Sequence, residues 1–213
     1  MPLTLHFLRH GQTEQSRDNV FCGAGLDPAL TPDGLAMAEA FAAAYRQVPW
    51  AAIYSSPLTR AQTTAAPLAR ALGMAPEVRD DLKEIAYGEW EGMSADEVGR
   101  RFHDDHIRWT ADPAWNPPTG GEPANMIARR ALRVVEEITG RFRDGNVLVV
   151  SHKATIRIVL CGLLGMEVGH FRFRLACPVG SVSVVEFGRQ GPMLQLLADR
   201  RHLDERLRNL PGT

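Results

Sequence analysis

The sequence contains little cysteine and no long apolar run. Its three cysteines, Cys22, Cys161 and Cys177, are widely spaced and form no CxxC pair, which excludes a disulfide framework and a zinc site of the usual spacing. We therefore expect reduced thiols and a cytoplasmic location. The longest apolar stretch, residues 158–166, is shorter than the roughly 20 residues that cross a bilayer. The N-terminus also lacks the basic and apolar regions of a signal peptide.

The sequence also lacks an excess of charge of one sign. The 24 Lys and Arg residues face 25 Asp and Glu residues, for a formal net charge of −1. This balanced net charge gives no support for nucleic acid or an anionic membrane as a partner. Only Lys83 and Lys153 are lysines, so arginine supplies nearly all of the positive charge. The planar guanidinium group suits phosphate wherever an arginine lies in a pocket.

What the sequence does contain is a regular alternation of predicted strands and helices. The predicted strands are residues 3–8, 51–56, 75–81, 146–152, 181–188 and 193–199, and the predicted helices are residues 31–47, 57–73, 94–109, 124–142 and 154–165. This alternation favours a three-layer α/β/α fold with a mainly parallel sheet. The length suits a single domain spanning residues 1–213, with two small domains left open. We expect the polar residues 200–213 to form a tail.

Three of the predicted strands end in cationic or imidazole side chains. The first strand ends at Arg9 and His10. Arg60 follows the second strand in the first turn of the next helix, and His152 follows the strand 146–152. Parallel strands place their carboxyl ends at one edge of a sheet, so these groups and two helix N-termini predict an anion site, most naturally for phosphate. The residues alone leave open a structural role for either histidine and a surface ion pair for Arg60.

Four segments of the sequence resemble the signature segments of a known family. They are LRHGQTE (8–14), YSSPLTRAQTTA (54–65), LKEIAYGEWEG (82–92) and VVSHKATIR (149–157). In this order they are similar to the histidine phosphatase superfamily, also called the phosphoglycerate mutase-like family. The resemblance covers about residues 3–188, and four segments in register are far more specific than RHG alone. It implies a phosphoglycerate mutase-like fold and one histidine phosphatase domain.

The resemblance also implies a role for each residue at a matching position. His10 matches the nucleophile that takes the phosphoryl group. Arg9, Arg60 and His152 match the pocket that holds the phosphate oxygens, and Glu84 matches the general acid. Cations can supply the charge neutralisation that phosphoryl transfer needs, so we expect no metal ion and no cofactor.

The assignment of the acid depends on the resemblance. Glu84, Glu89 and Glu91 lie close together in the sequence, and their chemistry alone does not choose among them. The family match selects Glu84. Burial beside a dianionic substrate is expected to help keep this carboxyl group protonated, ready to protonate a leaving alkoxide.

Among the residues expected to bind substrate, Ser16 and Lys153 depart from the family pattern. Ser16 stands where the family commonly has an asparagine that helps hold the phosphate, so we expect a single hydrogen-bond donor there. Cys22 and Gly23 lie in a loop that approaches the substrate in the family, and we expect Cys22 to pack without reacting. Lys153 follows the second histidine, where small glycines are common. It either adds a cation for an acidic substrate or points to solvent.

Three functions are compatible with these residues. The first is a metal-independent phosphatase, a phosphoric monoester hydrolase that acts on small phosphorylated metabolites through a phosphohistidine. The alternatives are a cofactor-dependent phosphoglycerate mutase and a non-catalytic protein that binds a phosphate ligand. The segment 85–98 resembles the phosphatase branch, whereas mutases typically read HYG-x-LQGLNK there, and the loop 111–121 is too short for a mutase-type insertion. Because every matched catalytic residue is present, a mere binding protein is disfavoured.

The half of the pocket that holds the rest of the substrate is less defined by sequence. Arg17, Lys153 and residues 85–121 are expected to shape it. The resemblance suggests phosphoglycerate, phosphoserine, sugar phosphates and α-ribazole phosphate as candidate substrates, and the sequence does not choose among them. Many relatives dimerise through a sheet edge, which keeps a homodimer open, but no exposed apolar strand can be identified from the sequence.

Several other histidines and tryptophans carry weaker signals. His103 and His106 lie three residues apart, but no third ligand has useful spacing, so we expect a solvated helix face and no metal. Trp90, Trp109 and Trp115 either wall the pocket or belong to an aromatic core. The sequence does not decide between these two positions.

Overall fold

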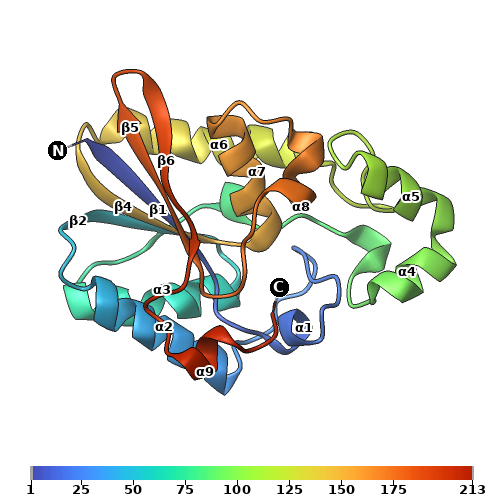
Figure 1. Ribbon diagram of the computed structural model, residues 1–213, viewed down its shortest axis with the longest axis horizontal. Coiled ribbons are helices and arrows are strands. Elements are labelled where there is room, and N and C mark those ends of the chain that lie inside the picture. Colours follow the sequence, from blue (N-terminus) through green and yellow to red (C-terminus); the bar gives the residue numbers. More distant parts are fainter. Residues whose placement is uncertain (1, 213) are drawn as a thin grey trace.

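The computed structural model describes residues 2–212 and is built around a six-stranded sheet (Figure 1). The strands lie in the order β3-β2-β4-β1-β5-β6. Their bounds are β1 Leu3–Arg9, β2 Trp50–Ser55, β3 Glu77–Val78, β4 Gly145–Ser151, β5 Val182–Gly188 and β6 Gly191–Asp199. β3, β2, β4 and β1 run parallel to one another. β5 pairs with β1 in the antiparallel direction and forms an antiparallel hairpin with β6. The sheet is therefore mainly parallel, as predicted.

Helices cover both faces of this sheet. α2 (Pro32–Tyr45) and α3 (Thr59–Leu72) pack on one face, and α6 (Ala124–Arg141) and α7 (Lys153–Leu163) pack on the other (Figure 1). Alternate strand residues enter the two cores, as period-2 side-chain alternation requires. This arrangement confirms the predicted three-layer α/β/α fold. Among residues 2–212, no helix combines the length and apolar composition needed to cross a bilayer.

The register of the parallel strands brings three strand ends together. Arg9 of β1 is paired with Ser151 of β4, and Ser55 of β2 is paired with Val150 of β4. The helices α3 and α7 begin just beyond this edge. The sheet therefore holds the residues that follow β1, β2 and β4 within one small volume.

The chain between β3 and α6 forms a lobe of short helices beside the sheet (Figure 1). It contains η1 (Asp80–Leu82), η2 (Gly88–Trp90), α4 (Ala95–Arg101) and α5 (His103–Ala111). Ser94 caps α4 in a capping box with Glu97. The prediction of one helix over 94–109 is wrong, because the chain breaks at Phe102, whose ring packs against Trp90.

The expected polar tail is also a folded segment. Residues 200–212 include α9 (Glu205–Arg208), whose N-cap Asp204 accepts a hydrogen bond from the Leu207 N–H at 2.7 Å. Leu203 and Leu207 are buried in a small cluster with Met37 of α2. The polar composition concealed these two leucines, four residues apart, which bind the segment to the body of the protein. The short helices α1 (Glu14–Arg17), η3 (Val168–His170) and α8 (Phe171–Arg174) complete the chain.

Candidate active site

His10 lies at the carboxyl end of β1, where the backbone turns away at Gly11. A Cβ atom at Gly11 would lie 2.4 Å from the carbonyl oxygen of Gly34, so the turn requires glycine. The Nδ1 atom of His10 lies 2.7 Å from the Gly11 carbonyl oxygen, which fixes Nδ1 as the protonated nitrogen. Burial, then Arg60 and then Arg9 hold the pKa of His10 well below its ordinary value. His10 is therefore a neutral imidazole whose Nε2 carries a lone pair.

Arg9 precedes His10 and is anchored by backbone carbonyl groups. Its Nη1 donates hydrogen bonds to Cys177 O at 2.7 Å and Gly212 O at 3.2 Å. The side chain is 4% exposed, and its Nε has no hydrogen-bond partner within residues 2–212. Burial lowers the pKa of Arg9 to about 10, so the guanidinium group stays charged at neutral pH. The segment 200–212, which the sequence predicts to be a tail, thus helps to hold Arg9 through the Gly212 carbonyl oxygen.

Arg60 stands in the first turn of α3 and is 1% exposed. Its Nη1 donates to Leu26 O at 2.7 Å and its Nη2 donates to Gly23 O at 3.0 Å. The carboxylate of Asp27 lies 3.6 Å from Nη1. These contacts aim the guanidinium group at the end of β1, where it lowers the pKa of His10.

His152 is the N-cap residue of α7 and is fully buried. Its Nε2 lies 2.7 Å from Ser56 Oγ, whereas its Nδ1 is buried with no hydrogen-bond partner in the described chain. Its ring centroid lies 5.2 Å from that of His10. Burial, Arg60 and His10 hold its pKa well below the ordinary value, so His152 is also neutral. The cavity described below does not reach it, and His152 lies behind His10.

Glu84 is buried at the start of α7, although it comes from the loop after β3. Its Oε1 accepts hydrogen bonds from the backbone N–H of Ile85 at 3.0 Å and of Thr155 at 3.1 Å, and it lies 3.2 Å from the Thr155 hydroxyl. Its Oε2 accepts only from the Ala154 N–H, at 3.1 Å. Oε1 is thus saturated, and Oε2 is the oxygen with capacity for a proton.

The two rival carboxylates lie elsewhere. Glu91 accepts hydrogen bonds from the backbone N–H groups of Gly23, Gly25 and Tyr87, so it holds a loop together. Glu89 is exposed. Among the three, only Glu84 lines the cavity that contains His10.

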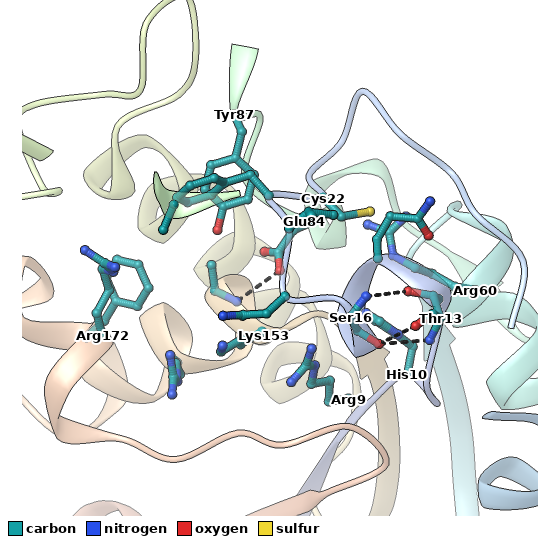
Figure 2. Close-up of a pocket in the computed structure, with 18 of the residues that line it drawn as sticks. Arg9, His10, Thr13, Ser16, Cys22, Arg60, Glu84, Tyr87, Lys153 and Arg172 are labelled. Carbon is teal, nitrogen blue, oxygen red and sulfur yellow. Dashed lines mark hydrogen bonds between the residues drawn. The ribbon is translucent and has the colours of Figure 1, made fainter. Parts of the chain in front are cut away.

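The cavity opens in front of His10 and has a volume of about 180 Å³. Figure 2 shows its wall, with His10, Arg9 and Arg60 on one side and Arg172 on the other. The lining residues come from the end of β1, α1 and the loop after it, α3, the loop between η1 and η2, α4, α5, α7 and α8. Such a cavity has room for a phosphate group and an organic group beyond it.

The predicted substrate contacts Ser16, Cys22 and Gly23 take different positions. Ser16 lines the cavity, but its hydroxyl donates to Thr13 O at 2.9 Å and accepts from the Thr13 N–H in a capping box, so its proton is not free for phosphate. Cys22 also lines the cavity, and burial raises the pKa of its thiol to about 11, so it stays protonated. Gly23 does not line the cavity and instead orients Arg60 through its carbonyl group.

The profile of the histidine phosphatase superfamily (branch 1) matches residues 5–200. This chain belongs to that superfamily. A protein of Mycobacterium tuberculosis that is named as bifunctional is 39% identical over 193 residues, which are 89% of this chain and 52% of that protein. The chain therefore spans about half the length of this curated relative.

Other superfamily members are similar over nearly their whole length. Phosphoserine phosphatase 1 of Hydrogenobacter thermophilus is 31% identical, with 94% of each chain covered. Among solved structures, the mycobacterial glucosyl-3-phosphoglycerate phosphatase in complex with inorganic phosphate has a TM-score of 0.81 and 26% identity, covering 94% of this chain and 99% of that chain. The predicted family and its phosphoglycerate mutase-like fold are confirmed. The activities in these names are those of phosphatases, and none favours the mutase alternative.

Arg130 supports the site although the sequence did not predict it. From α6 it donates to the carbonyl oxygens of Asp81, Lys83 and Glu84 at 2.6–3.1 Å and forms a two-point ion pair with Glu122. It therefore clamps the loop that presents Glu84. No local signal distinguishes this arginine from its neighbours in a helix rich in arginine.

The three tryptophans named in the sequence analysis take three different positions. Trp109 is buried but lines the cavity, Trp90 lies in the aromatic cluster behind it, and Trp115 is exposed. His106 packs against the rings of Trp90 and Trp109 rather than facing solvent as expected. No group of three or more His, Cys, Asp or Glu side chains within residues 2–212 is arranged to hold a metal ion. Arg17 pairs with Asp18 outside the cavity.

Proposed function

We propose that this chain is a metal-independent phosphatase that hydrolyses small phosphomonoesters through a phosphohistidine at His10. The observation that carries the proposal is the state of His10, a neutral imidazole with its Nδ1 bonded to the Gly11 carbonyl oxygen at the floor of a cavity. Neutral imidazole is a competent nucleophile, and the two buried guanidinium groups beside it favour an anionic substrate. We further propose that the described residues work as one domain.

In the first step, Nε2 of His10 attacks the phosphorus atom while the bond to the alcohol oxygen breaks. Arg9 and Arg60 neutralise the charge on the phosphoryl oxygens. The leaving alkoxide takes a proton from Glu84, and Oε2 is the oxygen with capacity to carry that proton. His152 does not line the cavity, and its ring centroid lies 5.2 Å from that of His10, so we assign it a positioning role behind the nucleophile.

In the second step, water attacks the phosphorus atom of the phosphohistidine. The Glu84 carboxylate takes the proton of the water, the bond between phosphorus and Nε2 breaks, and inorganic phosphate leaves. Both steps use the same carboxyl group, first as acid and then as base. The cycle therefore returns His10 to its neutral state and Glu84 to its protonated state.

The substrate of this proposal is a small phosphorylated metabolite. Relatives named for phosphoserine, α-ribazole phosphate and glucosyl-3-phosphoglycerate support this class. The proposed location is the cytoplasm, where the thiols of Cys22, Cys161 and Cys177 stay reduced, and all three are free cysteines.

The test is phosphate release from p-nitrophenyl phosphate in excess EDTA. We expect turnover by the wild type, none by His10→Ala, and wild-type turnover by His103→Ala, a control on the exposed side of α5. Quenching in alkaline denaturant during turnover should trap a phosphate on His10 that is stable to base and labile to acid, detected by mass spectrometry of the peptide under non-acidic conditions. Turnover that disappears with EDTA, or that survives in His10→Ala, would contradict the proposal.

A further inference from the structure

Three cationic side chains on the far side of the cavity have no use in the reaction proposed above. Lys153 and Arg157 lie four residues apart on α7 and so project from the same helix face, and Arg172 lies on α8. All three line the cavity. Figure 2 shows Arg172 on the side opposite Arg60, with Lys153 between them. The three side chains therefore extend the positive wall away from the phosphate pocket.

Among residues 2–212, none of these three cations has a carboxylate partner. The ion pairs among residues 2–212 include Arg79, Arg130, Arg133 and Arg141 but not Lys153, Arg157 or Arg172. Within the same residues, Nε of Arg157 and Nη1 of Arg172 are buried without a hydrogen-bond partner. Buried donors without partners are rare in native proteins, and these two N–H groups are available to an acceptor group.

The positive charges of Lys153, Arg157 and Arg172 also repel one another. Burial lowers the pKa of Lys153 to about 7, and the neighbouring Arg9 and Arg157 contribute to this shift. Burial lowers the pKa of Arg172 as well, with a contribution from Arg157. Such a group of like charges costs folding free energy, and an anion that enters between them removes that cost.

The surroundings of Arg172 orient its guanidinium group so that it can bind a carboxylate or a phosphate. Its Cζ lies 3.8 Å from the centroid of the Trp109 ring, so the guanidinium group stacks on the ring face. A stacked guanidinium keeps its N–H donors in its own plane, where a carboxylate or phosphate accepts two of them. Tyr87 also lines the cavity.

We infer that Lys153, Arg157 and Arg172 form a second anion subsite, which binds an anionic group on the alcohol part of the phosphomonoester. The inference rests on the proposed function and names its substrate class, phosphomonoesters with a second negative group. The charge of the cavity supports it. Five basic side chains and one carboxyl group line the wall. A phosphate dianion held by Arg9 and Arg60 leaves the other three basic groups with at most the Glu84 carboxylate as a counter-charge.

The experiment compares pairs of substrates that differ in the second anion. Glycerol 3-phosphate differs from 3-phosphoglycerate by a hydroxymethyl group in place of the carboxylate, and phosphoethanolamine differs from phosphoserine by the loss of the carboxylate. Fructose 6-phosphate and fructose 1,6-bisphosphate form the pair for a second phosphate. The measured quantity is the ratio of kcat/KM within each pair. We expect the anionic member to be preferred by at least about tenfold in one pair, which identifies the second anion as carboxylate or phosphate.

Variants of the subsite should remove this preference. In Arg172→Gln and in Arg157→Gln the ratio should fall about tenfold, whereas Arg172→Lys, which keeps the charge, should retain part of it. Arg174→Gln is the matched control, because Arg174 is exposed on the same short helix and does not line the cavity. A wild-type ratio near one in every pair, or equal losses in Arg172→Gln and Arg174→Gln, would overturn the inference.

Binding separates the failure of this inference from the failure of the proposed function. Calorimetric titration of the same pairs into His10→Ala measures the subsite without turnover. If the wild type hydrolyses none of the esters, the phosphatase proposal fails, and tighter binding of the anionic member that is lost in His10→Ala/Arg172→Gln still supports the subsite. Equal binding of both members of all three pairs overturns the subsite even if the wild type hydrolyses them.

Discussion

The backbone N–H of Thr155 donates a hydrogen bond to Oε1 of Glu84 at 3.1 Å. Since the Thr155 hydroxyl and the Ile85 N–H also face Oε1, the carboxyl group is held on one side and its Oε2 is left to the cavity. The start of α7, which follows His152, thus orients the proposed acid. The proposed nucleophile, His10, and the proposed acid, Glu84, come from distant parts of the chain, and β4 together with α7 sets their relative position.

The first prediction concerns that acid. Glu84→Gln keeps the shape of the side chain but cannot release a proton, so kcat for an ester with a poor leaving group such as glycerol phosphate should fall by about 10²–10⁴, with a much smaller change in KM. Steady-state kinetics with the exposed Glu89→Gln as control measures the effect. Near-normal kcat in Glu84→Gln would move the acid role to another group.

The second prediction concerns the clamp on the Glu84 loop. Arg130→Gln removes donors to the carbonyl oxygens of Asp81, Lys83 and Glu84, so kcat should fall by about 10-fold or more while KM changes little. Arg133→Gln, one turn along α6 in an exposed ion pair with Asp81, is the control. If thermal denaturation shows equal stability of both variants and Arg130→Gln still keeps full kcat, Arg130 does not position the acid.

The third prediction concerns the charge of His10. Its pKa lies well below the ordinary value, because of burial and the neighbouring Arg60 and Arg9. The neutral form exists above the pKa, so lowering the pKa extends the neutral nucleophile to lower pH. Nitrogen NMR of the free protein, assigned with His10→Ala, should show a neutral imidazole at pH 6.5, where free histidine is about half protonated. A midpoint near 6.5 would contradict this picture.

The fourth prediction concerns the contact between Gly212 and Arg9. Gly212 has φ +140°, and a Cβ atom there would lie 2.8 Å from a methyl carbon of Val179. Gly212→Val should therefore displace the carbonyl oxygen that accepts from Arg9, weakening inhibition by inorganic phosphate about two- to tenfold. Gly191→Val, at φ +110° with open space around it, controls for backbone strain alone. Equal inhibition constants in both variants would show that Arg9 does not depend on Gly212.

The sequence predicted that Arg9, His10 and Arg60 lie close together, because their proximity depends on topology. Once β1, β2 and β4 are parallel neighbours, the residues after each strand must meet at one edge. Arg9, His10 and Arg60 follow from this rule with no knowledge of packing.

The far side could not be predicted in the same way. Arg157 and Arg172 face the cavity only because α8 folds back beside α7 and because Trp109 provides a surface for stacking. These are contacts between segments that are distant in the sequence. Ser16 shows the reverse case, because its hydroxyl is occupied locally by Thr13, a capping contact that a family comparison does not reveal.

The position of Gly212 against Arg9 has a practical consequence for labelling. A fluorophore attached close to Gly212 would lie near Arg9, and its emission is expected to change when an anion binds there, without any added chromogenic ester. A purification tag is better placed before Leu3, because β1 begins at the opposite edge of the sheet from His10 (Figure 1). Leu3 thus marks a position that is remote from the proposed chemistry, and Gly212 marks a position that is adjacent to it.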